Sequence, residues 1–387
     1  MAIYLDHNAT TALDARVLDA MLPYLRDRFG NASSGHGFGR EARAAVELAR
    51  EQVAALVNAH PSQVVFTSGG TEANNTALKG CAARLSPGHI LLSAVEHNSV
   101  RASAQALQQQ GWMLAEMAVE SDGQLDMDAV HDLLSRLPAD SPLLMALMLA
   151  NNETGIIYDT ATVAELARDH NAILLVDAVQ AAGKMTVDFR ASGAQLMSLS
   201  AHKLYGPKGV GALIVDKAVD MMPLLHGGGH EKGRRAGSEN VAAIVGFGKA
   251  AELAHGELAA RRAHMKMLHQ YLETRLVSEL PQATIFGVEA ERLSNTTFFA
   301  LPGLDGETLL INLDQAGLAV SSGSACNTGE VEPSHVLLAM GVSPECARGA
   351  IRVSLGKDSR RDEIDQFIDC LKQQARSLQR FASLAYA

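Results

Sequence analysis

Two side chains in the sequence could perform covalent chemistry, Lys203 and Cys326. Lys203 follows an apolar run in SLSAHKLYGPKGVG (198–211). A lysine at the end of a buried strand is desolvated, which lowers its pKa and makes its neutral amine a nucleophile that can form a Schiff base with an aldehyde. Cys326 lies in SSGSACNTGEVEPSH (321–335), whose small polar residues are typical of an exposed loop. Because structural cysteines usually have apolar neighbours, this position predicts a reactive thiol.

A glycine-rich turn offers a place for a phosphate. VVFTSGGTEANNTAL (64–78) runs from an apolar strand through a turn containing Gly70 and Thr71 into a helix. The free N–H groups at a helix start bind anions, although a plain strand–helix turn would have the same composition. No Gly-Lys-Ser/Thr follows, so the segment is not a P-loop.

A phosphate site near a nucleophilic lysine suggests pyridoxal 5′-phosphate (PLP), an aldehyde cofactor that also needs an acidic partner for its ring nitrogen. Asp177 ends the apolar run in LLVDAVQAAGK (174–184) and is the candidate partner. A helix cap or a salt bridge is the alternative role for this carboxylate.

Three other polar residues lie at or inside apolar runs. His97 in SAVEHNS (93–99) and Asn152 in LANNETG (149–155) follow such runs, where local hydrogen bonding is the simplest role for either residue. Arg352 lies inside AIRVSLG (350–356). It is suited either to a structural ion pair or to a bidentate clamp for a substrate carboxylate.

A second glycine-rich segment, GGGHEKGRRAGSEN (227–240), contains His230 and Glu231. Its glycines exclude the helix that an HExxH metal motif requires, so we predict no metal site. We expect a mobile loop that places Ser238 near a phosphate or a subunit contact.

The order of apolar and helix-like segments predicts the scaffold. From about residue 39, short apolar runs alternate with helical patterns, which is typical of a mainly parallel sheet covered by helices on both faces. Ligands bind at the carboxyl ends of the strands in such sheets. After about residue 255, a long charged helix, shorter strands and a last helix indicate a smaller α+β domain. We predict an α/β fold with a large PLP-binding domain at 15–255 and a small domain, made of 1–14 and 256–387, that carries Cys326.

Composition narrows the class of protein. The chain has 387 residues, 47% of them hydrophobic, and a formal net charge of −10, which argues against nucleic acid and acidic membranes as partners. No stretch approaches the ~20 apolar residues of a membrane helix. The four cysteines are far apart and form no CxxC pair, so we expect neither a disulfide framework nor a zinc site, and a cytoplasmic location.

These segments, taken in order, closely resemble the NifS/IscS-type cysteine desulfurases of the class V aminotransferase family, which have fold-type I. The resemblance covers nearly the whole chain. Its motifs are YLDHNATT, FTSGGTEANN, VEHNS, NNETG, VDAVQAAGK, SAHKLYGPKG, GRRAGSEN, SSGSACNTGEVEPSHV and IRVSLG.

The resemblance implies roles around the cofactor. Lys203 would hold PLP covalently, Asp177 would pair with the ring nitrogen, and Gln180 would pair with the ring hydroxyl. His97 would stack on the ring and serve in catalysis. The phosphate would be bound by Gly70, Thr71, Ser200 and His202, with Ser238 reaching it from the second subunit of a homodimer.

It also implies the reaction. Asn152 and Arg352 would hold the carboxylate of L-cysteine, and Cys326 would accept its sulfur as a persulfide while L-alanine leaves. The sulfur would pass to an acceptor protein, such as an iron–sulfur scaffold. Two alternatives stay open, namely a selenocysteine lyase or other PLP enzyme of the same fold, and a non-catalytic dimeric module.

Overall fold

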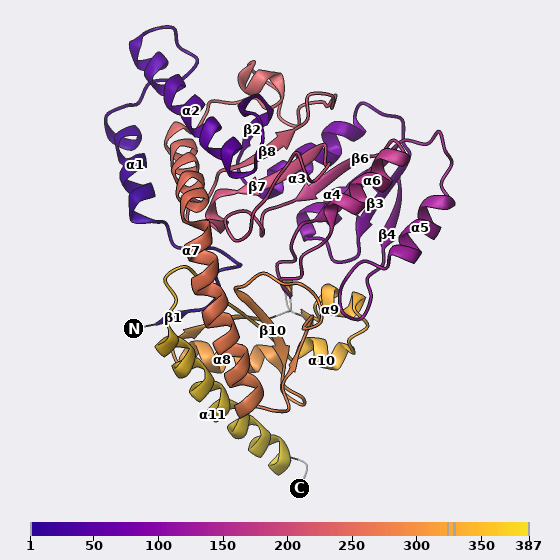
Figure 1. Ribbon diagram of the computed structural model, residues 1–387, viewed down its shortest axis with the longest axis vertical. Helices are drawn as coiled ribbons and strands as arrows, with labels where there is room; N and C mark the ends of the chain where they lie inside the picture. The colour runs from indigo at the N-terminus through magenta and orange to yellow at the C-terminus, as the bar shows by residue number, and fades with distance from the viewer. Residues whose placement is uncertain (1, 323–324, 328–329, 386–387) are drawn as a thin grey trace.

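A computed structural model of the chain describes residues 2–322, 325–327 and 330–385, with the backbone alone for 325–327, 330–331 and 379–385. Figure 1 shows a part built on a large sheet above a smaller part, and the long helix α7 (Val241–Glu279) runs through both.

The large sheet has seven strands in the order β2-β8-β7-β6-β5-β3-β4, and only β8 runs antiparallel to the others. The predicted mainly parallel sheet is therefore confirmed. Its strands are β2 (Val64–Thr67), β3 (His89–Ser93), β4 (Met113–Met117), β5 (Leu143–Met148), β6 (Ile173–Asp177), β7 (Leu196–Ser200) and β8 (Gly211–Val215).

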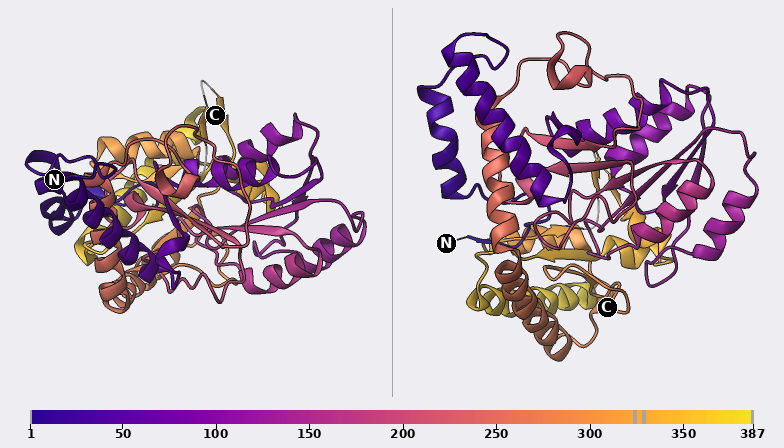
Figure 2. Two further views of the ribbon diagram at one scale, coloured as in Figure 1. Left: turned by 90° about the horizontal axis from the view of Figure 1, so that it is seen from above. Right: turned by 45° about the horizontal axis from the view of Figure 1, so that its top comes forward.

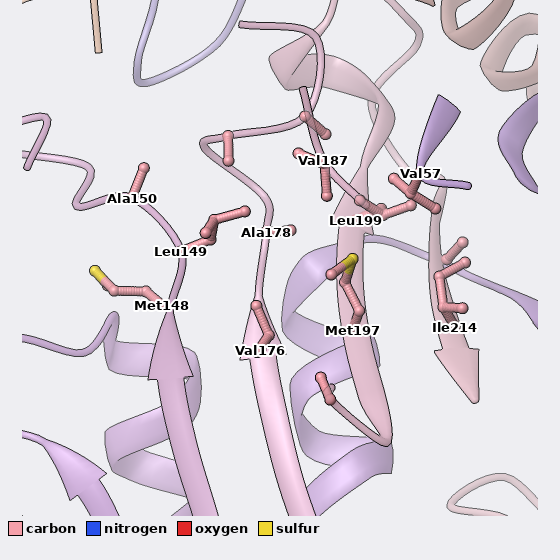
Figure 3. Close-up of a cluster of buried hydrophobic side chains, with 14 of the residues drawn as sticks. Val57, Met148, Leu149, Ala150, Val176, Ala178, Val187, Met197, Leu199 and Ile214 are labelled. Carbon is pink, nitrogen blue, oxygen red and sulfur yellow. The ribbon is translucent and has the colours of Figure 1, made fainter. Parts of the chain in front are cut away.

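The central strands are buried on both faces, which explains their continuous apolar sequences. On one face, Val176, Met197 and Ile214 lie side by side in register, as Figure 3 shows. On the other face, Leu175, Leu196 and Leu213 pack beneath two helices. Those two helices are α3 (Gly70–Ala82) and α4 (Asn98–Gln108).

Further helices cover the first face and its edge. In α2, five apolar residues from Ala42 to Leu56 are spaced 4-3-4-3 along one side of the helix, and all five are buried. Figure 2 shows α1 and α2 beside the upper half of α7, which both helices contact. The helices of this group are α1 (Ala15–Arg26), α2 (Gly37–Leu56), α5 (Met127–Ser135) and α6 (Thr160–Asp169).

The smaller part has its own sheet and apolar cluster. The sheet is antiparallel, in the order β12-β15-β10-β9, while β1 pairs parallel with β11. Ile3 and Leu5 pack in the cluster of this part. Its elements are β1 (Ile3–Tyr4), β9 (Thr284–Ile285), β10 (Thr296–Ala300), α8 (Gly306–Gln315), β11 (Leu318–Ala319), β12 (Ser321–Ser322), β13 (Ala325–Asn327), β14 (Glu330–Glu332), α9 (His335–Ala339), α10 (Pro344–Arg348), β15 (Ala350–Ser354) and α11 (Arg361–Ala385).

Some details differ from the sequence predictions. The long helix begins at Val241, well before residue 255, so the proposed domain boundary at 255/256 falls inside one continuous helix. The domain division itself remains a prediction. Within the described ranges, no helix combines the length and the apolar character that crossing a bilayer requires.

Candidate active site

A cavity of about 230 Å³ lies where the parallel strands β3, β5, β6 and β7 end. We call it the strand-end pocket. It contains every site residue that we predicted except Arg352 and Ser238, while the side chain of Cys326 lies outside the described part of the chain. Its lining residues are Gly70, Thr71, Asn74, His97, Ser99, Met148, Ala150, Asn152, Asp177, Val179, Gln180, Ser200, His202 and Lys203.

Asp177 is the last residue of β6 and is buried. Its carboxylate accepts hydrogen bonds from Asn74 Nδ2 at 2.8 Å and from the Val179 amide at 2.9 Å. The Val179 bond closes a turn and is not a helix cap, because no helix follows β6 directly, and no salt bridge to Asp177 occurs among the described residues. Its negative charge is therefore held only by neutral donors and is suited to a cationic ring nitrogen.

His97 caps the start of α4, which is a local hydrogen-bonding role of the kind that its sequence position suggested. Its Nδ1 accepts from the Ser99 amide at 3.1 Å and lies 2.8 Å from Ser99 Oγ. Because Nδ1 accepts, the proton of the neutral ring belongs on Nε2. Burial lowers the pKa of His97, with Asp177 opposing and Lys203 reinforcing this shift.

Asn74 and Ser99 are site residues that sequence reasoning missed. Asn74 Nδ2 donates both to Asp177 and to Ser99 Oγ, the latter at 2.9 Å, so the two residues connect Asp177 to His97. Both stand inside segments that the sequence marked, FTSGGTEANN and VEHNS, but only a fold that brings α3 and α4 together reveals the connection.

Lys203 ends a short 3-10 helix, η2 (Ala201–Lys203), that follows β7. Its Nζ donates to the backbone oxygens of Asn8 at 2.5 Å and Ala9 at 2.8 Å. Burial, and next the positive charge of Arg352, lowers the pKa of Lys203 to about 8. The amine is thus far more often neutral near pH 7 than an ordinary lysine, as a nucleophile must be.

The turn between β2 and α3 has the features of a phosphate site. A side chain at Gly70 would come within 2.7 Å of Val179 Cγ2, so the helix start stays open to the pocket. Ser200 Oγ is buried there and has no hydrogen-bond partner among the described residues. Burial lowers the pKa of His202 to about 4, and its Nδ1 lies 3.1 Å from Thr10 Oγ1.

These observations fit PLP. Among the described residues, the pocket joins a lysine amine with a lowered pKa, a carboxylate without a cationic partner, and a hydroxyl without a hydrogen-bond partner beside a helix N-terminus. Those are the groups that an aldehyde, a pyridinium nitrogen and a phosphate require.

Arg352 lies in β15 and forms the ion pair that its sequence position allowed, while its role as a clamp for a substrate carboxylate stays a prediction. Its Nη2 pairs with Asp6 Oδ1 at 2.7 Å, which is a structural ion pair. Its Nη1 donates to the backbone oxygen of Asn152, a pocket residue, at 2.9 Å, and its buried Nε has no partner in the described part of the chain. The guanidinium therefore lies next to the pocket, and its Nε–H is among the donors that these two bonds leave unused.

The segment 227–240 is more tightly packed than we expected. Glu231, in the 3-10 helix η3 (His230–Gly233), is buried and accepts from both terminal nitrogens of Arg50, each at 2.8 Å. It also accepts from the Phe66 amide at 2.9 Å. Glu231 therefore anchors this part of the segment, because its carboxylate neutralises a buried arginine, while the mobility of the loop that carries Ser238 stays a prediction.

Ser238 does not line the strand-end pocket of its own chain. It lines a separate cavity of about 190 Å³ that also includes Ser68 and Gly209. Nearby, Arg235 pairs with Glu72 of the first turn of α3 at 3.0 Å. That Ser238 reaches a phosphate from a second subunit stays a prediction.

Cys326 lies in a hairpin, although its sequence suggested a loop. Strand β13 pairs antiparallel with β14, and Cys326 stands opposite Val331. The side chain of Cys326 lies outside the described part of the chain. Just after the hairpin, Ser334 Oγ donates to Glu153, and His335 Nε2 lies 3.0 Å from the Glu96 backbone oxygen. Glu153 and Glu96 neighbour the pocket residues Asn152 and His97, so the hairpin is tethered beside the pocket.

Comparison with known proteins agrees with this geometry. The class V aminotransferase family model matches residues 3–367. Cysteine desulfurase 2 of Trichormus variabilis is 43% identical over 370 residues, which are 95% of this chain and 92% of that protein.

Solved structures give the same result. A NifS-like protein is 36% identical with a TM-score of 0.89, over 97% of this chain and 100% of that chain. SspA in complex with cysteine is 30% identical with a TM-score of 0.80, over 92% of this chain and 99% of that chain. This chain therefore belongs to the class V aminotransferases, PLP-dependent enzymes of fold-type I, and within them to the cysteine desulfurases of the NifS and IscS type.

Proposed function

We propose that the protein is a cysteine desulfurase that converts L-cysteine to L-alanine and transfers the sulfur to Cys326 as a persulfide. The observation that carries the proposal is the strand-end pocket, where Lys203 with a pKa of about 8, Asp177 and His97 line one cavity. The names of the similar proteins support the substrate.

The cofactor would be held by the residues that line the pocket. Lys203 would bond covalently to PLP, Asp177 would hold the ring nitrogen in its protonated form, and Gln180 would bind the ring hydroxyl. His97 would cover the ring. The phosphate would lie at the start of α3, bound by Gly70, Thr71, Ser200 and His202. When bound, PLP acts as an electron sink for the charge that develops when a proton leaves the substrate Cα.

The chain's own groups would perform the remaining steps. Asn152 and Arg352 would orient the substrate carboxylate, and Lys203, once free, would remove the Cα proton. The thiolate of Cys326 would then bond to the substrate sulfur. As that S–S bond forms, the Cβ–S bond breaks, its electron pair stays with Cβ, and Cβ takes up a proton to give the methyl group of alanine. Lys203 would return the proton that it removed, so that Cα of alanine regains its hydrogen.

Cys326 must lose its proton before it attacks. An ordinary cysteine, with a pKa of ~8.5, is only a few per cent thiolate at neutral pH. The neutral ring of His97, at the pocket wall, could accept this proton or relay it. The persulfide would then pass to an acceptor protein, such as an iron–sulfur scaffold, and the few, widely spaced cysteines support a cytoplasmic setting.

We also propose a homodimer. Helix α1 has a stripe of exposed apolar residues, Leu18, Leu22 and Leu25, on one side. Phe29 and Phe38 continue it, 79% and 57% exposed, with ring centroids 5.6 Å apart. Exposed apolar patches of this kind mark protein interfaces. In a dimer formed through this patch, Ser238 of one subunit would reach the phosphate site of the other subunit.

The test of the reaction is direct. Purified protein reconstituted with PLP should release one alanine for each sulfur atom recovered from L-cysteine, as persulfide or, with a reducing thiol present, as sulfide. A protein that binds PLP but releases pyruvate or transfers the amino group from L-cysteine would contradict the proposal.

A further inference from the structure

Lys184, which the reaction described above does not use, is a buried lysine next to the pocket. It lies four residues after Gln180, and only 8% of the residue is exposed. Its Nζ donates to Gln180 Oε1 at 2.7 Å and to Asn8 Oδ1 at 2.8 Å. Both acceptors are neutral amides, and no carboxylate pairs with Lys184 within the described residues. A buried charge without a counter-ion is costly, so this arrangement needs an explanation.

The groups that face Lys184 favour its neutral form. Lys203 and Arg352, from η2 and β15, both add positive charge near it, and His7 of the N-terminal segment also feels its charge. Burial is the largest cause that holds its pKa well below the usual value. A neutral amine has two N–H donors, which matches the two acceptors in contact with it.

Asn8 completes a closed network. Its side-chain oxygen binds Lys184, while its backbone oxygen accepts from Lys203 Nζ at 2.5 Å and from Gln180 Nε2 at 3.0 Å. A backbone oxygen can only accept, so the end of Gln180 that touches it must be the NH₂ end. The oxygen end of Gln180 is consequently the one that Lys184 holds.

This assignment decides which face Gln180 offers to the pocket. One hydrogen of Nε2 is used by Asn8, Oε1 is used by Lys184, and the second hydrogen of Nε2 remains for a ligand. We propose that Lys184 is a positioning residue that commits the Gln180 amide to donate an N–H to the oxygen substituent on the cofactor ring. The inference rests on the proposed placement of PLP in the pocket but not on the fate of sulfur.

The expected effect has a definite sign. The ring oxygen of the cofactor attracts a proton to the nitrogen that links Lys203 to the cofactor. An N–H group that donates a hydrogen bond to the same oxygen weakens this attraction. The bond therefore lowers the pKa of that nitrogen, and losing the bond raises it. In Lys184→Met, Gln180 Oε1 is left buried and unpaired, so the amide turns to find another partner. The pH midpoint of the visible absorbance change of bound PLP should rise by about one unit.

The experiment is a double-mutant cycle on the PLP-loaded protein without L-cysteine. Lys184→Met should raise the midpoint in the natural background but add nothing in a Gln180→Leu background, because both changes remove the same bond. Lys266→Met, an exposed lysine on α7, is the matched control and should leave the midpoint unchanged. An unmoved midpoint in Lys184→Met, or a full second shift in the Gln180→Leu background, would overturn the inference.

A purely structural role for Lys184 would lower the melting temperature without moving the midpoint. If Lys184→Met does not retain PLP, Lys184→Gln takes its place, since its side chain is one atom shorter and cannot hold both acceptors. A smaller rise is expected there, and no rise would contradict the inference. Because the readout needs no turnover, a protein that fails as a desulfurase but binds PLP still gives a clear answer.

Discussion

The strand-end pocket and the hairpin of β13 and β14 are built in opposite ways. The pocket lies at the ends of strands that are buried on both faces, and its polar groups are joined by short hydrogen bonds from Asp177 through Asn74 and Ser99 to His97. Cys326 lies in β13, which pairs with β14 in a separate two-stranded sheet. The described residues of these two strands pair only with each other.

This difference corresponds to the two halves of the proposed reaction. Proton transfers at the substrate need groups that are in position beforehand, which a network anchored on a buried sheet provides. A group that collects sulfur in one place and delivers it in another must not be locked into that network. A two-stranded hairpin alone is only marginally stable, and this one is held next to the pocket through Ser334 and His335. Substitutions in the pocket and substitutions in the hairpin should therefore impair different steps of the reaction.

The largest effect is expected for Lys203→Ala, in the pocket. The variant should lose covalent attachment of PLP, and alanine formation should fall by on the order of a thousandfold or more. Borohydride treatment followed by mass spectrometry measures the attachment. A reducible lysine–PLP adduct that persists in the variant would show that another lysine holds the cofactor. Lys266→Met serves as the control.

Arg352→Ala tests whether the guanidinium beside the pocket binds substrate or only pairs with Asp6. A charge-assisted clamp contributes about 1.5–3 kcal/mol, so the KM for L-cysteine should rise about ten- to a hundredfold with PLP retained.

Asp6→Asn is the matched control for Arg352→Ala, because it breaks the same ion pair but keeps the guanidinium. Its KM should change little. Loss of PLP and an equal drop in melting temperature in both variants would favour the structural ion pair alone.

The lowered pKa of Lys203 predicts how attachment of PLP depends on pH. Only the neutral amine reacts, and a pKa of about 8, lowered mainly by burial, means that this form dominates above pH 8. The rate of PLP attachment to the cofactor-free protein should rise about tenfold per pH unit up to about pH 8 and then level off. Nα-acetyl-lysine, with an ordinary amine, is the control. A protein rate that keeps rising to pH 10 would contradict the shift.

The smallest effect is expected for Ser238→Ala. If Ser238 reaches a phosphate in a second subunit, one hydrogen bond to a charged group is lost, and PLP affinity should fall by about tenfold. Ser278→Ala, on the surface of α7, should leave affinity unchanged. Equilibrium dialysis measures the affinity, and analytical ultracentrifugation tests the dimer. An active monomer would refute the shared site.

The ends of the parallel strands were predictable from the sequence. A buried strand followed by a polar residue is visible locally, and the α/β rule then places Asp177, Lys203 and His97 at one edge of the sheet. Their neighbours were not predictable, because Asn74 meets Ser99 only through the packing of α3 against α4.

Long-range pairs were also hidden. Arg50 and Glu231 are 181 residues apart, and the glycines around Glu231 suggested a loop although its carboxylate is buried. The hairpin at Cys326 was missed for a related reason: its residues have weak strand propensity, so the pairing of Cys326 with Val331 depends on the surrounding structure rather than on local sequence.

The most direct test of the division between pocket and hairpin is Cys326→Ser, compared with Cys81→Ala, Cys346→Ala and Cys370→Ala. We measure PLP absorbance, its response to L-cysteine, alanine release, and the residue that carries a trapped persulfide. Cys326→Ser should keep the PLP absorbance and its response to L-cysteine, because those depend on the pocket. It should carry no persulfide and lose catalytic alanine release, since serine is a far weaker nucleophile toward sulfur. The other three variants should turn over nearly normally. Near-normal alanine release by Cys326→Ser would contradict the account and assign the chain to another class of PLP lyase.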